Sequence, residues 1–172
     1  MKQVLPPLIV LLGPTASGKT DLAIQLAKEF GGFIISADSR QIYRHMDIGT
    51  AKPTREQLRA VRHEMIDIVE PDEPFSLAQY QERVFALLER SEKTTLPFLV
   101  GGTGLYIDAV IRNWDIPKVA PNVKRREELE KLPCNILVNL LHALDPDSAA
   151  FIDPNNRRRI IRAIEVTETT GK

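Results

Sequence analysis

Short apolar runs alternate with amphipathic segments along the first two thirds of this 172-residue chain. The apolar runs are too short for helices and are bounded by Gly, Pro or polar residues, which is typical of buried strands. They occupy residues 8–12, 33–37, 65–69 and 97–100. Apolar positions recur with the spacing of a helix face in residues 19–30, 77–88 and 105–112. Ser76 and Gln79 match a capping box, which predicts where the second helix begins.

This alternation predicts an α/β fold in which a parallel sheet is covered by helices on both faces. In such sheets, ligands bind beyond the carboxyl ends of the strands. Three features that are distant in the sequence follow predicted strands: the Gly-rich segment 13–20, Asp38 and the segment 101–104. We therefore expect them to meet at one edge of the sheet.

The pattern changes after Asn113, where a segment punctuated by Pro leads into two short helical pieces and a loop. This composition predicts a small helical insertion over residues 114–153. Helical spacing returns from Arg157, with apolar positions at Ile160, Ile161 and Ile164. We therefore expect an α/β core over residues 1–113, the insertion, and a helix over 154–172 that returns to the core.

The overall composition is that of a soluble globular protein, with 43% apolar and 27% charged residues. Lys plus Arg and Asp plus Glu both number 23, so net charge argues neither for nor against nucleic acid. Aromatic residues make up 6%, too few for a broad base-stacking surface. The single cysteine, Cys134, fits a reducing cytoplasm. No apolar run approaches the length of a membrane span, so we expect no membrane association.

The segment "GPTASGKT" carries the clearest chemistry, because it fits the P-loop pattern between a predicted strand and a predicted helix. Loop amides and the helix N-terminus would bind a phosphate, Lys19 would add charge, and the Thr20 hydroxyl suits Mg²⁺. The fold is thus expected to be a P-loop NTPase-like parallel sheet, and the motif leaves the identity of the polyphosphate open. The predicted diphosphate- or nucleotide-binding residues are Gly13, Pro14, Thr15, Ala16, Ser17, Gly18, Lys19 and Thr20.

Asp38 directly follows a predicted strand and is the first candidate for a catalytic residue. Asp is also common in turns and helix caps, so the local sequence supports both interpretations. Its expected position beside the phosphate loop favours the catalytic one. P-loop NTPases usually carry a second Asp after a buried strand, but here the fourth strand leads into "GGTG". This difference argues against triphosphate hydrolysis.

Basic residues cluster at 124–126 and at 157–162. The first cluster is interleaved with Glu, which favours a solvated helix face. The second contains four Arg in six residues, a density that suits phosphodiester contacts, although a solvated face stays an alternative. The three histidines, at positions 45, 63 and 142, show no metal-ligand spacing and are interpreted as structural or exposed.

Four segments occur in an order that resembles one known family: "GPTASGKT", "SADSRQIYRHMDIGTAKP", "PFLVGGTGLY" and "DPNNRRRIIRAIEV". From about residue 7 onward, the chain resembles the tRNA dimethylallyltransferases. The resemblance implies that the P-loop holds dimethylallyl diphosphate and not ATP, with Mg²⁺ as cofactor. It also implies that the prenyl group is transferred to the exocyclic N6 amine of the tRNA adenosine directly 3′ of the anticodon.

The resemblance assigns roles to individual residues. It makes Asp38 the general base, implies that the target base is flipped into the site, and makes Thr20 the metal-binding residue. Arg158 stands where the family motif Gln-Arg-x-x-Arg has Gln, so an amide acceptor is lost there. Arg125 is a rival for the position of Lys124, because the preceding loop varies in length. The implied tRNA contacts are Asp38, Ser39, Arg40, Gln41, Thr103, Lys124, Arg158, Arg159 and Arg162.

Two other functions remain open from the residues alone. A P-loop small-molecule kinase would use Asp38 to orient an acceptor hydroxyl and would consume ATP. A non-catalytic nucleotide- or tRNA-binding module would bind without producing prenylated RNA. The resemblance further implies a cytoplasmic enzyme that is monomeric at full length. Since members of that family continue well beyond "RAIEV", we expect a C-terminally truncated chain that binds diphosphate but transfers prenyl groups poorly or not at all.

Overall fold

Four parallel strands form the centre of the first part of the chain in the computed structural model, which describes residues 6–171. Strand β4 lies between two neighbours, so that Leu99 pairs with Val10 on one side and with Ile35 on the other. The strands are β1 (Ile9–Leu12), β2 (Phe33–Ser36), β3 (His63–Glu64) and β4 (Pro97–Gly101), in the order β1-β4-β2-β3. The predicted parallel α/β sheet is confirmed.

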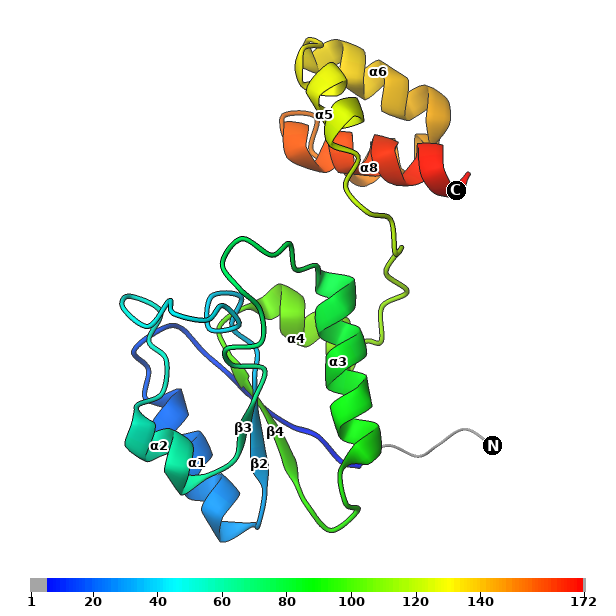
Figure 1. The fold of residues 1–172 in the computed structure, drawn as a ribbon. Helices are drawn as coiled ribbons and strands as arrows, with labels where there is room; N and C mark the ends of the chain where they lie inside the picture. The colour runs from blue at the N-terminus through cyan, green and yellow to red at the C-terminus, as the bar shows by residue number, and fades with distance from the viewer. Residues whose placement is uncertain (1–5, 172) are drawn as a thin grey trace. The chain divides into compact units, whose positions relative to one another are not determined.

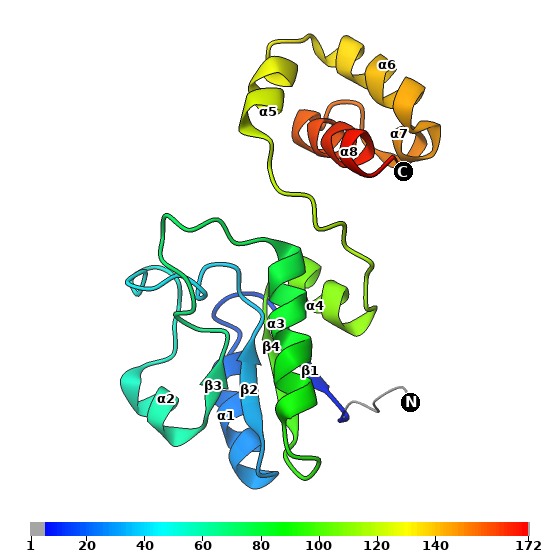
Figure 2. The ribbon, with the colours of Figure 1, turned by 45° about the vertical axis from the view of Figure 1, so that its right-hand side comes forward.

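Helices cover both faces of this sheet (Figures 1 and 2). The side chains of a strand point alternately to opposite faces, so neighbouring residues of β2 join different cores. Ile34 packs with α1, whereas Ile35 packs with α3 and α4. The helices are α1 (Lys19–Glu29), α2 (Arg55–Ala60), α3 (Leu77–Arg90) and α4 (Gly104–Ile111). The capping box predicted at Ser76 and Gln79 is present at the start of α3.

Two strands differ from the sequence-based prediction. Strand β1 lies at an edge of the described sheet, and both Ile9 and Leu12 are exposed, so the prediction that it is buried was wrong. The third strand is His63–Glu64 and not 65–69. Met65 and Asp67 have φ angles of 63° and 54°, in the left-handed region, where an extended strand cannot continue.

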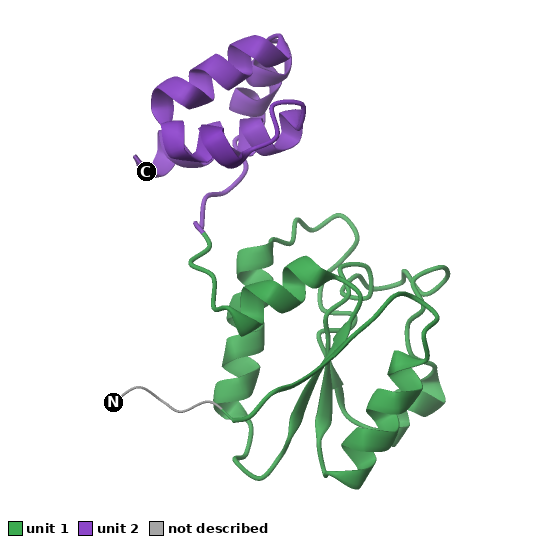
Figure 3. Ribbon diagram, turned by 180° about the vertical axis from the view of Figure 1, so that it is seen from behind, with its two compact units in different colours: residues 1–116 green, residues 117–172 purple. Residues whose placement is uncertain are grey.

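A second compact unit, residues 117–172, consists of helices around a core of its own (Figure 3). The helices are α5 (Val123–Glu130), α6 (Cys134–Leu144), α7 (Pro146–Phe151) and α8 (Arg157–Thr170). Leu129, Leu137 and Leu141 pack with Ile160 and Ile164 of α8. The division of the chain thus falls at 116/117, and the helix expected to return to the α/β core belongs to the second unit. Every helix among residues 6–171 is too short or too polar to cross a membrane.

A buried carboxylate ties the second unit together. The Glu165 side chain is 2% exposed and accepts hydrogen bonds from both Arg126 and Arg162, at 2.6 and 2.5 Å. The backbone N–H of Asn122 donates to its other oxygen at 2.6 Å. Burial raises the pKa of Glu165, but these donors outweigh burial and lower the pKa to about 2 from its ordinary 4.5. The charged form therefore joins α8 to the start of α5.

Because of this carboxylate, the free energy of unfolding of the second unit should fall as the pH is lowered into the acid range. A carboxyl group whose pKa is lower in the folded state stabilises the fold above its unfolded pKa, and this stability is lost as the pH falls from about 4.5 towards 2. We expect Glu165→Gln to weaken this pH dependence and to cost about 1–3 kcal/mol at pH 7, because a charged acceptor is lost. NMR methyl signals of Ile160 and Ile164, followed through urea titrations of the full chain, would measure both effects. Glu168→Gln, which removes an exposed partner of Arg125, should change them little.

Candidate functional site

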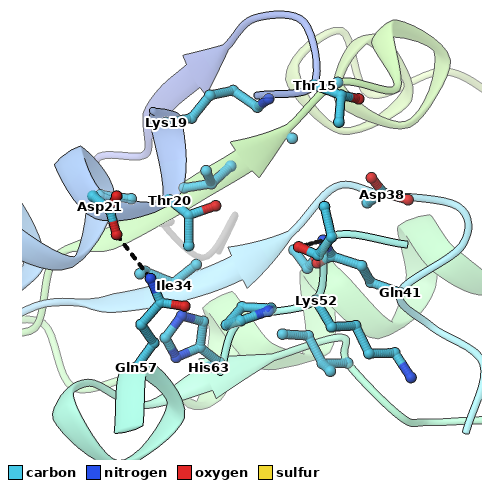
Figure 4. A pocket seen from close by; sticks show the side chains of 18 of the residues that line it. Thr15, Lys19, Thr20, Asp21, Ile34, Asp38, Gln41, Lys52, Gln57 and His63 are labelled. Atoms are coloured by element: carbon cyan, nitrogen blue, oxygen red, sulfur yellow. Dashed lines mark hydrogen bonds between the residues drawn. The ribbon is translucent and has the colours of Figure 1, made fainter. Parts of the chain in front are cut away.

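A cavity of about 450 Å³ opens at the carboxyl edge of the sheet in the first unit (Figure 4). The phosphate loop and the loop after β2 form its walls, and the turn after β4 completes them. The lining residues include Thr15, Ala16, Ser17, Gly18, Lys19, Thr20, Ser36, Asp38, Gln41, Lys52, His63, Gly101 and Gly102. The three sequence features expected at one edge of the sheet therefore do meet there.

The phosphate loop has the geometry that its sequence requires. Gly18 precedes α1 with φ 77°, and no side chain caps this helix, so the first amides of α1 are left for an anion. Lys19 Nζ donates to the backbone oxygen of Pro14 at 2.6 Å. A bound phosphate would offer this ammonium group a charged acceptor in place of that carbonyl, and charged acceptors form the stronger hydrogen bonds.

Thr20 lies half-buried in the first turn of α1 and lines the cavity. The neighbouring Asp21 accepts a hydrogen bond from Gln57 Nε2 at 2.7 Å. Among residues 6–171, no group of three or more His, Cys, Asp or Glu side chains is arranged to hold a metal ion. A magnesium ion here would take the Thr20 hydroxyl together with substrate phosphate and water oxygens, which is a common arrangement for Mg²⁺.

Asp38 stands at the cavity wall with one carboxylate oxygen committed to its own loop. Its Oδ1 accepts from the backbone N–H of Arg40 at 2.8 Å, whereas Oδ2 accepts no hydrogen bond from the described residues. Figure 4 shows Asp38 across the cavity from Thr20. One oxygen thus orients the carboxylate and the other is available to a ligand.

Hydrogen bonds join the loop after β2 to the turn after β4. The backbone N–H of Ser39 donates to Thr103 Oγ1 at 3.3 Å, and the N–H of Thr103 donates to Ala37 O at the same distance. A Cβ atom on Gly101 would lie 2.2 Å from Ala37 O, so only glycine permits this approach. Ser39 and Thr103, both predicted tRNA contacts, are therefore neighbours, and Arg40 is exposed beside them.

The Gln41 side chain forms its hydrogen bonds within the protein. Its Oε1 accepts from Ser36 Oγ at 2.9 Å, and its Nε2 donates to the carbonyls of Thr50 and Ala51 at 3.3 and 3.0 Å. The Tyr80 hydroxyl donates to Ser36 O at 2.9 Å from the core below. The Gln41 amide therefore holds the wall of the cavity, and its tRNA contact stays a prediction.

Sequence reasoning missed His63, which lines the cavity from β3. Its Nδ1 lies 2.8 Å from Val61 O, so Nδ1 carries the hydrogen and Nε2 is an acceptor. That Nε2 is buried and has no partner among the described residues. Burial lowers the pKa of His63, despite the hydrogen bond to Val61, so the ring is neutral at pH 7. No sequence spacing could have revealed this, because the position depends on sheet register.

Sequence reasoning also missed Lys52, whose side chain is only 6% exposed. Its Nζ donates to Tyr43 O at 2.7 Å, to Asp47 at 2.8 Å and to Asp67 at 2.6 Å. Burial lowers the pKa of Lys52, but the hydrogen bonds that it donates to Asp47 and Asp67 outweigh burial and raise the pKa. Lys52 is thus a permanent cation that joins three parts of the chain beside the cavity.

The arginines of α8 divide into two groups. Arg157 donates to carbonyls at and just beyond the end of α5, including Leu132 O at 2.7 Å, and Arg162 donates to Glu165 and to Val119 O. Arg158 and Arg159 are exposed, and their guanidinium groups bond to nothing else among the described residues. These two, with Arg162, border a second cavity of about 590 Å³ over α7 and α8.

The rivals on α5 differ in the same way. Arg125 donates to Glu168 at 2.5 Å and to Glu128 at 3.2 Å. Lys124 is exposed and has no side-chain partner within residues 6–171. A contact with an outside phosphate is thus easier for Lys124 than for Arg125, whose ion pairs would first have to break.

Comparison with known proteins identifies the family. The sequence model of the IPP transferase family matches residues 41–172. The chain belongs to this family. A tRNA dimethylallyltransferase of a Roseiflexus species is 54% identical over 96% of this chain, and one of Staphylococcus carnosus is 47% identical over 97%. The chain spans 56% and 55% of the lengths of these two relatives.

Solved structures of the IPP transferase family extend the comparison to the fold. The full-length tRNA isopentenylpyrophosphate transferase of Bacillus halodurans matches with a TM-score of 0.62 and 46% identity, over 96% of this chain and 56% of that chain. A eukaryotic dimethylallyltransferase acting on tRNA matches with a TM-score of 0.83 and 29% identity, over 97% of this chain and 42% of that one. The P-loop-like α/β fold is therefore shared with solved tRNA prenyltransferases.

The Lys52 cluster generates a prediction about loop order. Lys52→Met should free the segment 43–52, because three hydrogen bonds to one charged group are lost together. Amide hydrogen exchange, read by mass spectrometry, should be roughly tenfold faster in this segment and unchanged in α3. Lys28→Met, on the exposed side of α1, is the matched control and should leave the segment protected. Unaltered exchange in Lys52→Met would contradict the anchoring role.

Proposed function

We propose that this protein transfers a dimethylallyl group from dimethylallyl diphosphate to the exocyclic N6 amine of the adenosine 3′-adjacent to the anticodon of tRNA. The observation that carries this proposal is a single cavity, in a member of the IPP transferase family, that joins a phosphate loop to the free oxygen of Asp38. The names of the relatives, tRNA dimethylallyltransferases, support it. The lone thiol of Cys134 is consistent with a cytoplasmic location.

The phosphate loop would stabilise the leaving group. Breaking the bond between the allylic carbon and oxygen places negative charge on the diphosphate, and fixed donors aimed at that charge lower the barrier. The loop amides and Lys19, after it leaves Pro14 O, are such donors. Mg²⁺ held by Thr20 and the diphosphate would supply further positive charge when bound.

Asp38 would act on the acceptor. The adenine amine is a poor nucleophile because its lone pair is delocalised into the ring. As the new carbon–nitrogen bond forms, the nitrogen loses a proton, and the unbonded Oδ2 of Asp38 is the base placed to take it. The target base must leave its stack to reach the cavity, so the reaction requires base flipping.

The tRNA contacts would come from exposed cations without internal partners among the described residues and from polar residues near Asp38. Arg158, Arg159 and Lys124 are exposed cations suited to phosphates. Ser39, Arg40 and Thr103 lie at the cavity edge beside Asp38. Gln41 and Arg162 could contact tRNA only by giving up the internal hydrogen bonds described above for hydrogen bonds to the RNA.

Labelled dimethylallyl diphosphate, incubated with Mg²⁺ and tRNA, tests the proposal directly. Label appearing on the tRNA adenosine, without consumption of ATP, is the expected result. ATP consumed in proportion to product would instead identify a kinase. Binding of tRNA without any transfer, in this chain and in a full-length relative alike, would identify a non-catalytic module.

Asp38→Asn tests the general base. We expect turnover to fall by roughly 10²-fold or more, because general-base catalysis commonly contributes about 10²–10⁴. The amide can still accept from the N–H of Arg40, so the loop should keep its shape. Asp108→Asn, on α4, is the control with the same chemical change. Single-turnover rates near those of the wild type would remove Asp38 from the mechanism.

Arg159→Ala and Arg162→Ala should give different results although both lie on α8. Arg159 has no internal side-chain partner among the described residues, so its loss should reduce the slope of log affinity for tRNA against log salt by about one and leave stability unchanged. Arg162 bonds to buried Glu165, so its loss should destabilise the second unit. Salt titrations of tRNA binding and urea unfolding of each variant measure these effects. An unchanged slope in Arg159→Ala would make that residue part of a solvated face.

A further inference from the structure

The segment 43–52, here called the 43–52 loop, leaves the wall of the cavity and returns to it. Gln41, just before the loop, and Ala51 and Lys52 at its end all line the cavity. In Figure 1 the loop is the cyan segment beyond the carboxyl ends of the strands. At its tip, next to Gly49, Ile48 is 99% exposed. An apolar side chain thus stands in water at the tip of a loop whose two ends adjoin the cavity.

This loop is held firmly at several points. Thr50 Oγ1 donates to Met46 O at 2.7 Å across the tip, and the N–H of Arg44 donates to Val69 O at 2.9 Å near the base. Lys52 and Gln41 add the hydrogen bonds already described. Fixing a surface segment costs conformational entropy, so an ordered loop needs this many bonds. The tip is therefore presented in one position.

The backbone of the loop is also strained. His45 and Ala51, which are not glycines, have φ angles of 61° and 51°. Such residues persist only where the surroundings hold them, and they occur preferentially at functional sites. Here the strained positions flank the tip on both sides. The loop thus keeps an unfavourable conformation that exposes Ile48.

The charges of the loop favour a base over a phosphate as its contact. Arg44 pairs with Glu70 at 2.9 Å, and Lys52 pairs with Asp47 and Asp67. The cations of the loop are thus neutralised within the protein, and the tip offers aliphatic surface. A single exposed Ile is ordinary on a protein surface. What distinguishes Ile48 is that it stands at the tip of an ordered loop whose start and end adjoin a cavity that, under the proposed function, receives a flipped base.

We infer that Ile48 packs against a base of the anticodon loop next to the target adenosine and helps to hold that stack open. The inference rests on the proposed function. Aliphatic side chains inserted beside bases are a known way to offset the cost of unstacking. Ile48 would thus be a positioning residue that acts on the RNA, whereas Asp38 acts on the reacting amine.

The test uses an anticodon stem-loop RNA with 2-aminopurine in place of the target adenosine. The fluorescence of 2-aminopurine rises when the base is unstacked. Because it lacks the amine at C6, it cannot be prenylated there. The wild-type chain should bind the RNA and raise the fluorescence. Ile48→Ser should lower affinity about fivefold and reduce the fluorescence rise at saturation at least twofold. Its salt slope and its binding of inorganic pyrophosphate should stay unchanged, because no charge is removed and the P-loop is intact.

Two variants control this experiment. Ile48→Leu keeps an aliphatic tip and should restore both readouts. Ile111→Ser makes the same chemical change at another exposed Ile, on α4 and outside the cavity lining, and should behave as the wild type. An Ile48→Ser variant that binds and unstacks the RNA as the wild type does would overturn the inference.

The remaining outcomes separate this inference from the proposed function. If the wild-type chain neither binds the RNA nor raises its fluorescence, the proposed function fails and the inference fails with it. If Ile48→Ser changes only the sedimentation of the chain and not its effect on RNA, the tip is a protein contact, and the assignment to RNA is overturned.

Discussion

The candidate site depends on the close approach of two strand ends. Gly101, at the end of β4, lies against the backbone of Ala37, at a distance that leaves no room for a Cβ atom. This contact, together with the bonds of Thr103 to the neighbouring loop, sets the distance between Asp38 and the phosphate loop. The backbone N–H of Gly13 also donates to Gly101 O at 3.4 Å. Gly101 therefore contacts both the phosphate loop and the loop after β2, which form the walls of the cavity. A larger residue there would move the Asp38 carboxylate relative to the phosphate loop, and under the proposed function such small misplacements of reacting groups are costly.

The sequence was sufficient for those features that a local pattern determines. The P-loop follows from its own spacing, and the capping box at Ser76 follows from two residues three positions apart. The meeting of Asp38 with the phosphate loop was also predictable, because the carboxyl ends of parallel strands lie at one edge. The third strand was not. Its apolar run, 65–69, has the composition of a strand, yet the backbone is left-handed at Met65 and Asp67. Asp67 bonds to Gln41 O and to Lys52, which are distant in the sequence, and no local pattern encodes such bonds.

Charged residues were the least predictable, since their roles depend on partners distant in the sequence. Nothing in the sequence around Lys52, which stands between Ala51 and Pro53, marks it as buried, but in the fold its side chain is only 6% exposed and lies between Asp47 and Asp67. Glu165 looks like the solvated acid at the end of a basic run, but it is the buried group around which the second unit is built. In both cases a charge is taken out of water, and such a group is tolerable only with several partners in good geometry.

The same reasoning decides which basic residues of α8 would be available to RNA under the proposed function. Four arginines follow one another closely at the start of α8, and in the sequence they are equivalent. Once Glu165 is buried it requires Arg162, and Arg157 donates to the carbonyls at and just beyond the end of α5. Arg158 and Arg159 remain on the outside because a helix turns by about 100° per residue and cannot direct three consecutive side chains to one side. The buried acid thus selects, from a uniform run of cations, those that can meet a phosphate. An RNA surface of this kind can be located only after the internal ion pairs of the fold are known.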